Sequence, residues 1–221
     1  MACFDTMEFL PDPEPHSAPL NMAMDEILLE EISVPVLRIY RWLNPAVSFG
    51  YFEKYASVEN QYADRDLVRR WTGGGVVLHG EDFTYSLIVP HGCALMQMSP
   101  AQSYLAIHEV ITQAMQESGI AASIAAAPAP KISTACFENA VRHDVLLNSR
   151  KIAGAAQRRT RHGLLHQGSI QGDALTGNFA EKFGAKLSAN VVQRPVRHRE
   201  IAAAATLAES KYATPRWMRK F

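Results

Sequence analysis

The most informative segment of this sequence is residues 69–79, Arg-Arg-Trp-Thr-Gly-Gly-Gly-Val-Val-Leu-His. Three consecutive glycines between apolar segments are unfavourable in backbone entropy, which indicates a tight turn or the close approach of a ligand to the main chain. Arg69 and Arg70 stand directly before them, and guanidinium groups with exposed backbone N–H groups can bind phosphate or carboxylate. The pattern is neither the Gly-x-Gly-x-x-Gly motif nor a Walker loop. The alternative is a structural hairpin with solvated arginines.

Alternating apolar residues predict strands on both sides of this turn and along much of the chain. We expect strands at residues 36–42, 46–51, 67–71, 76–79, 83–90 and 162–170, and a hairpin around Asn148-Ser149. Many of these strands are joined by turns too short for crossover connections. The sequence therefore predicts an α+β fold with a mixed, largely antiparallel β-sheet flanked by helices, and not a doubly wound nucleotide fold.

Helical spacing predicts the elements that cover this sheet. We expect helices from Leu20, around residues 57–66, from the Ser99-Pro100 cap, and near 178–187 and 199–210. On the first helix the apolar residues share one face, which places Asp25 and Glu26 on the solvent side. The proline-rich residues 10–19 are expected to be an irregular lead-in.

The composition is that of a globular chain of 221 residues, with 48% hydrophobic and 20% charged residues. It excludes a wholly disordered chain, a collagen-like repeat and a heptad rod. No apolar run approaches the ~20 residues that span a bilayer, and the acidic N-terminal segment lacks the basic start of a signal peptide. We therefore expect a single domain over residues 1–221, located in the cytoplasm and without a membrane partner.

The formal net charge of zero conceals an asymmetry. Residues 1–141 contain 7 Lys and Arg against 17 Asp and Glu, whereas residues 142–221 contain 15 against 5, so the two parts carry −10 and +10. The two parts can neutralise each other in the fold. Alternatively, the basic part faces an anionic partner such as a nucleotide, a phosphopantetheine carrier or an acidic protein. No basic and aromatic repeat typical of single-strand binders is present, so no nucleic-acid partner is expected.

A second candidate site combines Cys136 with the segment that starts at Lys151. Lysine is uncommon at the start of an apolar strand unless it is exposed at an edge or functional. Gly154 and Ala155 belong to a run of small residues that leaves room for a chain-like ligand. A lysine in a partly dry site can hold a carbonyl or phosphate oxygen, or lower the pKa of a nearby thiol. The alternative is an edge lysine beside a buried cysteine.

The histidines and cysteines do not suggest a metal site. His79, His143, His162 and His166 lack zinc-ligand spacing, and so do the three cysteines. Of these histidines, His79 and His166 are expected to be hydrogen-bonded structural residues, and His79 is the better candidate to line a site. No metal ion is therefore expected.

Together these segments resemble the catalytic domain of the biotin/lipoate A/B protein ligase family. The resemblance covers most of residues 20–172 and is carried by six stretches, which are Asn21–Glu26 with Leu28–Glu30, Leu37–Trp42, Ser48–Gly50, Arg69–His79, Lys151–Gln157 and His166–Ile170. It implies a mixed sheet like the catalytic core of biotin ligases and class II aminoacyl-tRNA synthetases. We expect no separate accessory domain of the kind that many lipoate ligases of the family carry. It also implies attachment of an octanoyl or lipoyl group to a lysine of a lipoyl domain.

The family contains two branches that differ in chemistry. Its ligases use ATP to make an acyl-adenylate, and there the Arg70 position, residues 75–78 and the Lys151 position hold the nucleotide and the acyl carbonyl. Its octanoyltransferases use no ATP and take octanoate from acyl carrier protein through a cysteine thioester. Cys136-Phe137 and residues 83–86 look like the transferase branch, although Gly75 stands where transferases often carry arginine.

The resemblance therefore predicts an octanoyl-[acyl carrier protein]:protein N-octanoyltransferase that needs no cofactor. Cys136 and Lys151 are the predicted catalytic residues, with Lys151 favouring the Cys136 thiolate. The predicted binding residues are Arg70, Thr72, Gly73, Gly74, Gly75, Val76, Val77, Leu78, His79, Gly154 and Ala155. The expected partners are octanoyl-acyl carrier protein and lipoyl-domain acceptor proteins. One alternative is a lipoate–protein ligase that uses free lipoate or octanoate with ATP and Mg and forms lipoyl-AMP, and the other is a non-catalytic binder of lipoyl domains.

Overall fold

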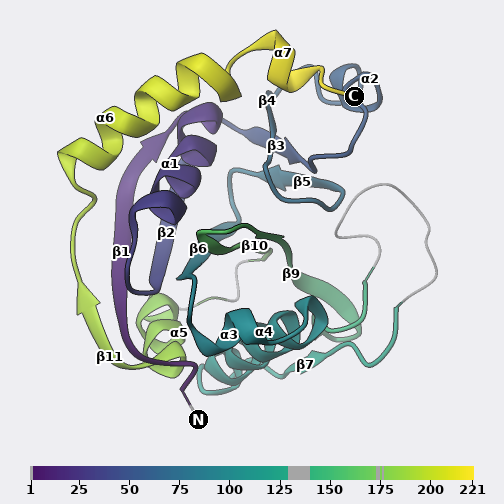
Figure 1. Cartoon of the computed structure of the whole chain (residues 1–221). Helices are drawn as coiled ribbons and strands as arrows, with labels where there is room; N and C mark the ends of the chain where they lie inside the picture. The colour runs from purple at the N-terminus through teal and green to yellow at the C-terminus, as the bar shows by residue number, and fades with distance from the viewer. Residues whose placement is uncertain (1, 129–139, 173–174, 176) are drawn as a thin grey trace.

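The computed structural model describes residues 2–128, 140–172, 175 and 177–221. Its centre is an eight-stranded sheet in the order β11-β1-β2-β6-β10-β9-β8-β7 (Figure 1). β1 pairs in parallel with β11 and β2, and the other neighbours pair antiparallel. The strands are β1 (Phe4–His16), β2 (Val36–Trp42), β6 (Phe83–Pro90), β7 (Ala122–Ile124), β8 (Val145–Leu147), β9 (Arg150–Arg159), β10 (Gly163–Ile170) and β11 (Ser188–Gln193). The predicted mixed, largely antiparallel sheet is confirmed.

A second, three-stranded sheet carries the glycine-rich segment. β3 (Ala46–Phe49) lies between β4 (Asp66–Arg69), which is parallel to it, and β5 (Val76–His79), which is antiparallel to it. The glycines fill the connection from β4 to β5. In Figure 1 this small sheet lies above the end of the large sheet formed by β6, β10 and β9.

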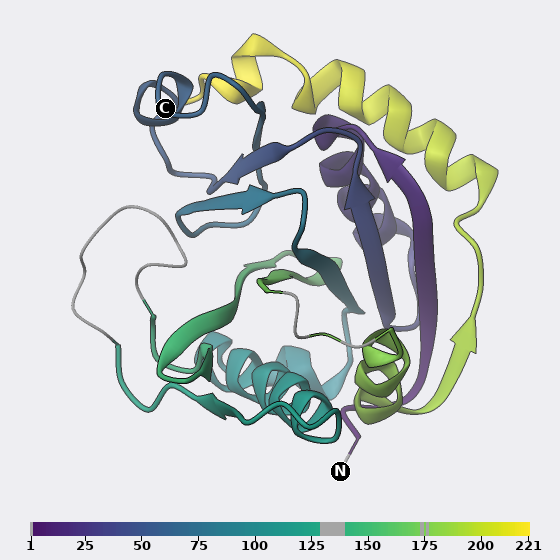
Figure 2. The same cartoon turned by 180° about the vertical axis from the view of Figure 1, so that it is seen from behind.

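Helices cover both faces of the large sheet, as Figures 1 and 2 show from opposite sides. α4 (Pro100–Gln116) and α5 (Phe179–Leu187) pack on one face around Met7, Leu87 and Phe183, and α1 (Ala18–Glu31) and α6 (His198–Leu207) pack on the other. This double cover explains why all eight residues of β10 are buried instead of alternating. The remaining elements are short, namely α2 (Ala56–Glu59), α3 (Ala94–Gln97), a π-helical turn η1 (Ala208–Tyr212) and α7 (Pro215–Met218).

The predicted start of α4 is confirmed in detail. The Ser99 hydroxyl accepts from the backbone N–H of Gln102, the Gln102 side chain accepts from the Ser99 backbone N–H, and Pro100 occupies the first helical turn. By contrast, the polar segment predicted to be helical over 57–66 forms only the four-residue α2.

The expectation of an irregular lead-in at residues 10–19 is wrong, because β1 continues to His16 and pairs with β2 up to that residue. Pro11, Pro13 and Pro15 alternate along β1, so their missing N–H groups all fall on one side of the strand. On the β11 side the paired register ends at Phe9, and the remainder of β1 pairs only with β2. The prolines therefore interrupt no ladder, and a register shift between Asp12 and Pro15 absorbs the remaining irregularity.

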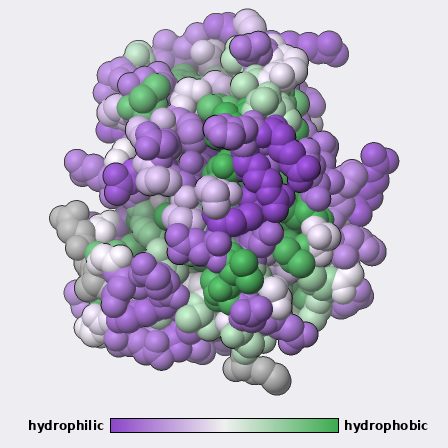
Figure 3. All heavy atoms as spheres, turned by 90° about the vertical axis from the view of Figure 1, so that its left-hand side faces the viewer, coloured by the Kyte–Doolittle hydropathy of each residue, from purple (hydrophilic) through white to green (hydrophobic). Residues whose placement is uncertain are grey.

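The surface seen from the left of Figure 1 is mostly hydrophilic, with hydrophobic residues confined to separate patches (Figure 3). α6 and β11 lie on this side of the molecule. Within the described ranges, none of the helices combines the length and the apolar character that a bilayer-spanning helix requires.

Candidate active site

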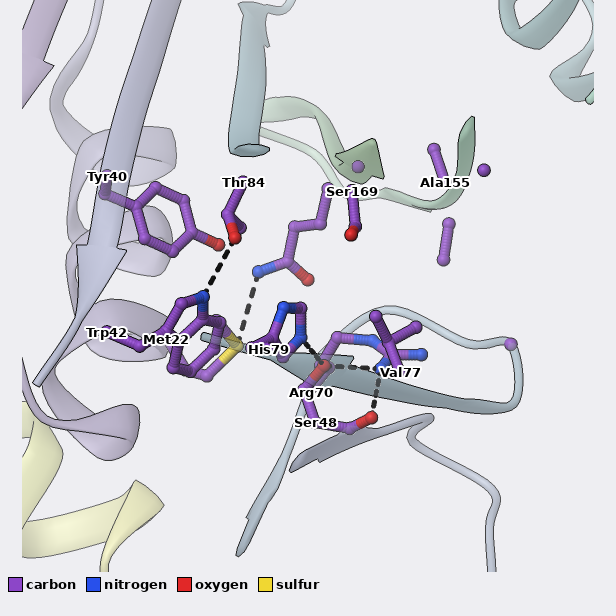
Figure 4. Close-up of a pocket in the computed structure, with 15 residues that line it drawn as sticks. Met22, Tyr40, Trp42, Ser48, Arg70, Val77, His79, Thr84, Ala155 and Ser169 are labelled. Atoms are coloured by element: carbon purple, nitrogen blue, oxygen red, sulfur yellow. Dashed lines mark hydrogen bonds between the residues drawn. The ribbon is translucent and has the colours of Figure 1, made fainter. Parts of the chain in front are cut away.

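A narrow pocket with a cavity volume of about 30 Å³ lies where the two sheets meet (Figure 4). This volume is well below the roughly 300–1,000 Å³ of small-molecule sites, so the walls of the pocket lie close together. Its wall combines the small sheet, the glycine-rich loop, the first helix and four strands of the large sheet, β2, β6, β9 and β10. The lining residues are Met22, Tyr40, Trp42, Ser48, Arg70, Gly74, Val77, His79, Thr84, Gly154, Ala155, Ala156, Gln167, Gly168 and Ser169.

The glycine-rich loop passes along the pocket and is held by Arg70. Gly74 has φ +87°, a conformation that favours glycine, so the predicted requirement for bare backbone is confirmed at this position. The Arg70 guanidinium donates to the carbonyl oxygens of Gly73 at 3.0 Å and Gly75 at 2.8 Å, and to both the carbonyl and the hydroxyl of Ser48. Much of the donor capacity of Arg70 therefore fixes the loop against β3.

A chain of hydrogen bonds ties the same loop to a buried ion pair. The Thr72 hydroxyl donates to Gln167 Oε1 at 2.7 Å, and Gln167 Nε2 donates to Asp25 at 2.8 Å. Asp25 also receives a 2.9 Å bond from Arg38, and both side chains are fully buried. Burial raises the pKa of the Asp25 carboxyl, although the neighbouring Arg38 charge opposes that shift. The predicted solvent-facing position of Asp25 is wrong, because this residue anchors the site.

A second chain runs through His79 at the edge of the pocket. His79 Nε2 lies 2.6 Å from the Ser48 hydroxyl and His79 Nδ1 lies 2.8 Å from Asp82, while its ring stacks on Trp42 at 4.2 Å. Burial alone would raise the pKa of Asp82, but the charge and hydrogen bond of His79 and the hydroxyls of Ser169 and Thr84 lower it overall. His79 is thus both a structural histidine and a pocket residue, as predicted.

Lys151 lies directly behind the pocket wall. Its Nζ forms a 2.9 Å ion pair with Asp144, and the two side chains are 3% and 0% exposed. Asp144 also accepts hydrogen bonds from the Tyr104 hydroxyl at 2.6 Å and from the Val141 N–H at 2.7 Å. A Cβ on Gly154 would lie 2.7 Å from Lys151 Nζ, so only the absence of a side chain at this lining position lets the ammonium come so near the pocket.

Residues 17–203 match the model of the lipoyl protein ligase A/B catalytic domain. The chain belongs to this family. It is 39% identical over 166 residues to Octanoyltransferase LipM of Oceanobacillus iheyensis, covering 71% of this chain and 60% of that protein. It is 31% identical over 208 residues to Octanoyltransferase LipM of Staphylococcus epidermidis, covering 82% and 74% of the two chains. The chain thus spans about 60% of the length of several curated relatives that it matches.

Solved structures of lipoate–protein ligases share the fold. Lipoate-protein ligase A bound with ATP superposes with a TM-score of 0.76 at 18% identity, covering 98% of both chains. The bipartite lipoate protein ligase of Thermoplasma acidophilum gives a TM-score of 0.73 at 17% identity, covering 99% of this chain and 98% of that one. The predicted family and fold class are confirmed.

The structure of this lipoyl ligase A/B domain gathers about half of the predicted binding residues in the pocket wall. These are Arg70, Gly74, Val77, His79, Gly154 and Ala155. Thr72, Gly73, Gly75, Val76 and Leu78 fall outside the lining. Thr72, Gly73 and Gly75 act on the pocket through the hydrogen bonds described above, Val76 packs in a small core with Phe49, and Leu78 is 44% exposed.

Cys136, the predicted nucleophile, lies outside the described residues. The candidate site also contains residues for which the sequence analysis proposed no role, foremost Asp82, Tyr104 and Asp144. Across the described ranges, no group of three or more His, Cys, Asp or Glu residues is arranged to hold a metal ion.

Proposed function

We propose that this protein transfers an octanoyl group from acyl carrier protein to a lysine of a lipoyl domain, through a thioester on Cys136 and without a cofactor. The observation that carries the proposal is the buried Lys151 ammonium. It forms an ion pair with Asp144 and lies behind Gly154, a pocket-lining residue without a side chain. Two relatives that are 39% and 31% identical carry the name octanoyltransferase, which supports the same chemistry.

The first half-reaction loads the protein. The Cys136 thiol gives up its proton, and the thiolate attacks the thioester carbonyl of octanoyl-phosphopantetheine. A bond forms between the cysteine sulfur and the acyl carbon, the bond from that carbon to the phosphopantetheine sulfur breaks, and the leaving thiolate takes up the released proton. A positive charge at Lys151 favours the thiolate and stabilises the oxyanion. The octanoyl chain enters between the two sheets, whose walls must move apart because the pocket is smaller than an eight-carbon chain. Each buried methylene contributes about 0.8 kcal/mol.

The second half-reaction unloads it. The neutral amine of an acceptor lysine attacks the thioester carbonyl, an amide bond forms, and the cysteine sulfur leaves as a thiolate. The proton released from the amine returns to solvent or to the thiolate. The acceptor is a lipoyl-domain protein, and the reaction takes place in the cytoplasm.

The test combines two donors with matched variants. The protein is incubated with a lipoyl domain and either octanoyl-acyl carrier protein or octanoate with ATP and Mg, and the acceptor is weighed by intact mass spectrometry. We expect transfer from the carrier alone, its loss in Cys136→Ser and Lys151→Ala, and normal transfer in Cys93→Ser. Cys93 is a half-buried free cysteine near α3 and serves as the matched control.

The other outcomes separate the alternatives. Transfer that requires ATP and survives Cys136→Ser would replace this proposal with a ligase that forms an acyl-adenylate. An acceptor that binds but gains no mass with either donor would indicate a non-catalytic binder of lipoyl domains.

A further inference from the structure

Three cations share one surface region beside the pocket, and we call Arg158, Arg216 and Lys220 the cationic strip. The Arg158 guanidinium lies 4.7 Å from the ring centre of Trp71 and 5.2 Å from that of Tyr51. Lys220 Nζ lies 4.7 Å from the centre of the same Tyr51 ring. Arg216 and Lys220 line one open groove on the segment that contains α7.

The strip carries positive charge that the fold does not neutralise. In the part of the chain that the structure describes, none of the ion pairs includes a member of the strip, whereas neighbouring Lys211 pairs with Glu26 and Arg219 pairs with Glu59. The charged residues that line the groove are all cations. Arg216 and Lys220 are also exposed, so both can meet an anion in solution.

The strip begins at the edge of the pocket. Arg158 follows the pocket residue Ala156 by two positions on β9, and it donates a 3.3 Å hydrogen bond to the carbonyl of Trp71, which directly follows the pocket residue Arg70. Lys220, two residues after the end of α7, contacts the same Tyr51 ring as Arg158 does. Figure 1 shows the C-terminal end of the chain next to α2 and the small sheet, above the strands that line the pocket.

Exposed aromatic side chains accompany these charges. Phe52 is 73% exposed and Phe221 is 50% exposed, and the centres of their rings lie 4.9 Å and 5.4 Å from that of Tyr51. Arginine and aromatic residues are enriched in protein–protein contacts, and this surface contains both.

We infer that the cationic strip is the docking surface for the acyl donor, an acidic carrier protein whose prosthetic arm contains a phosphate. This inference rests on the proposed function. The arm places its thioester in the pocket, while its phosphate must stay outside the apolar wall, next to the pocket edge where Arg158 lies. Arginine and lysine bind phosphate there, and Arg216 and Lys220 attract the acidic residues of the carrier.

The charge of the strip favours the donor over the acceptor as its occupant. Of the two protein partners, only the donor brings a phosphate, which the acceptor's lysine side chain lacks. The donor brings a phosphate and carboxylates, which such a surface attracts and orients.

The test is a charge reversal measured with two donors. We compare the unaltered protein with the Arg216→Glu and Lys220→Glu double variant, using octanoyl-acyl carrier protein or octanoyl-pantetheine with the same lipoyl domain. For the carrier donor we expect kcat/KM to fall at least about tenfold at low salt and the deficit to shrink as salt rises. For octanoyl-pantetheine, which lacks the carrier and the phosphate, we expect less than a twofold change. Arg199→Glu, on the exposed surface of α6, is the matched control and should leave both donors unaffected.

Three results would overturn the inference. Equal losses with both donors would mean that the strip acts through the pocket and not through the carrier. A rise in KM for the lipoyl domain, with the carrier parameters unchanged, would assign the surface to the acceptor. No transfer from either donor by the unaltered protein would refute the proposed function itself, and the inference with it.

Discussion

The substitution Gly154→Ala tests whether the position of Lys151 matters for transfer. An added Cβ would lie 2.5 Å from Lys151 Cε and 2.7 Å from Nζ. Ordinary van der Waals contact begins at 3.4 Å, so Cε must retreat by about 0.9 Å. A misplacement of about 1 Å near reacting atoms lowers rates roughly 100-fold, or about 2.7 kcal/mol in activation free energy. We therefore expect single-turnover octanoyl transfer to slow by about two orders of magnitude.

The same substitution should leave the protein folded. The crowded atoms belong to the end of a flexible side chain and not to backbone, so we expect the free energy of unfolding to fall by only about 1–3 kcal/mol. Gly177→Ala is the matched control, since a Cβ at Gly177 meets nothing within 4 Å. Rates are measured by rapid quench with mass detection of the acceptor, and stability by urea unfolding.

A double-mutant cycle with Lys151→Ala completes this test. If Gly154→Ala acts only by displacing Lys151, adding it to Lys151→Ala should cause no further loss of activity. The reasoning would be refuted if Gly154→Ala kept its rate within threefold while Lys151→Ala was inactive, or if the two losses added fully.

Three further predictions concern stability. Gly74→Ala should lower the free energy of unfolding by about 1–2 kcal/mol, because φ is +87° at this position. Gly73→Ala is the control: an added Cβ meets nothing within 4 Å there, so the loss of stability measured in the same urea titration should be smaller. Arg38→Met should lower it by about 3–5 kcal/mol, because Asp25 then remains a buried, unpaired carboxylate, and wild-type stability would refute this. Burial lowers the pKa of His108 from 6.5 to about 4, so the unfolded chain binds a proton at a higher pH than the folded chain does. The free energy of unfolding should therefore fall by about 3 kcal/mol between pH 6.5 and pH 4. His108→Asn should remove this part of the pH dependence of stability.

Local patterns in the sequence predict most of the fold, and the failures share a cause. The prolines of β1 suggest irregular structure when only residues adjacent in sequence are considered. The strand nevertheless forms, because the prolines lack N–H groups on the side that pairs with no other strand beyond Phe9. Likewise, helical spacing predicts that Glu26 faces solvent on α1, and this prediction is wrong. Glu26 is buried under η1, where it accepts hydrogen bonds from Lys211 at 2.6 Å and from Tyr212. The partners are 185 and 186 positions away, so no spacing rule can find them.

The residues of the candidate site also fall into those that the sequence could predict and those that it could not. Gly74, Arg70 and the small residues at 154–155 could be predicted, because glycine and charged residues in apolar surroundings are conspicuous in a sequence. Asp144 and Asp82 could not, because each is a single carboxylate whose role depends on the side chains that fold against it. The identity of the family needed the long motifs, and neither composition nor periodicity could supply it.

The position of Lys151 relative to the glycine-rich loop depends on contact between two sheets. The loop and His79 belong to the small sheet, whereas Lys151 and Gly154 belong to the large one. Thr72 reaches across to Gln167, and Arg158 reaches across to the carbonyl of Trp71. These hydrogen bonds are directional, and the one from Thr72 to Gln167 is buried. They therefore fix the distance between the two sheets at the pocket more tightly than apolar packing alone could.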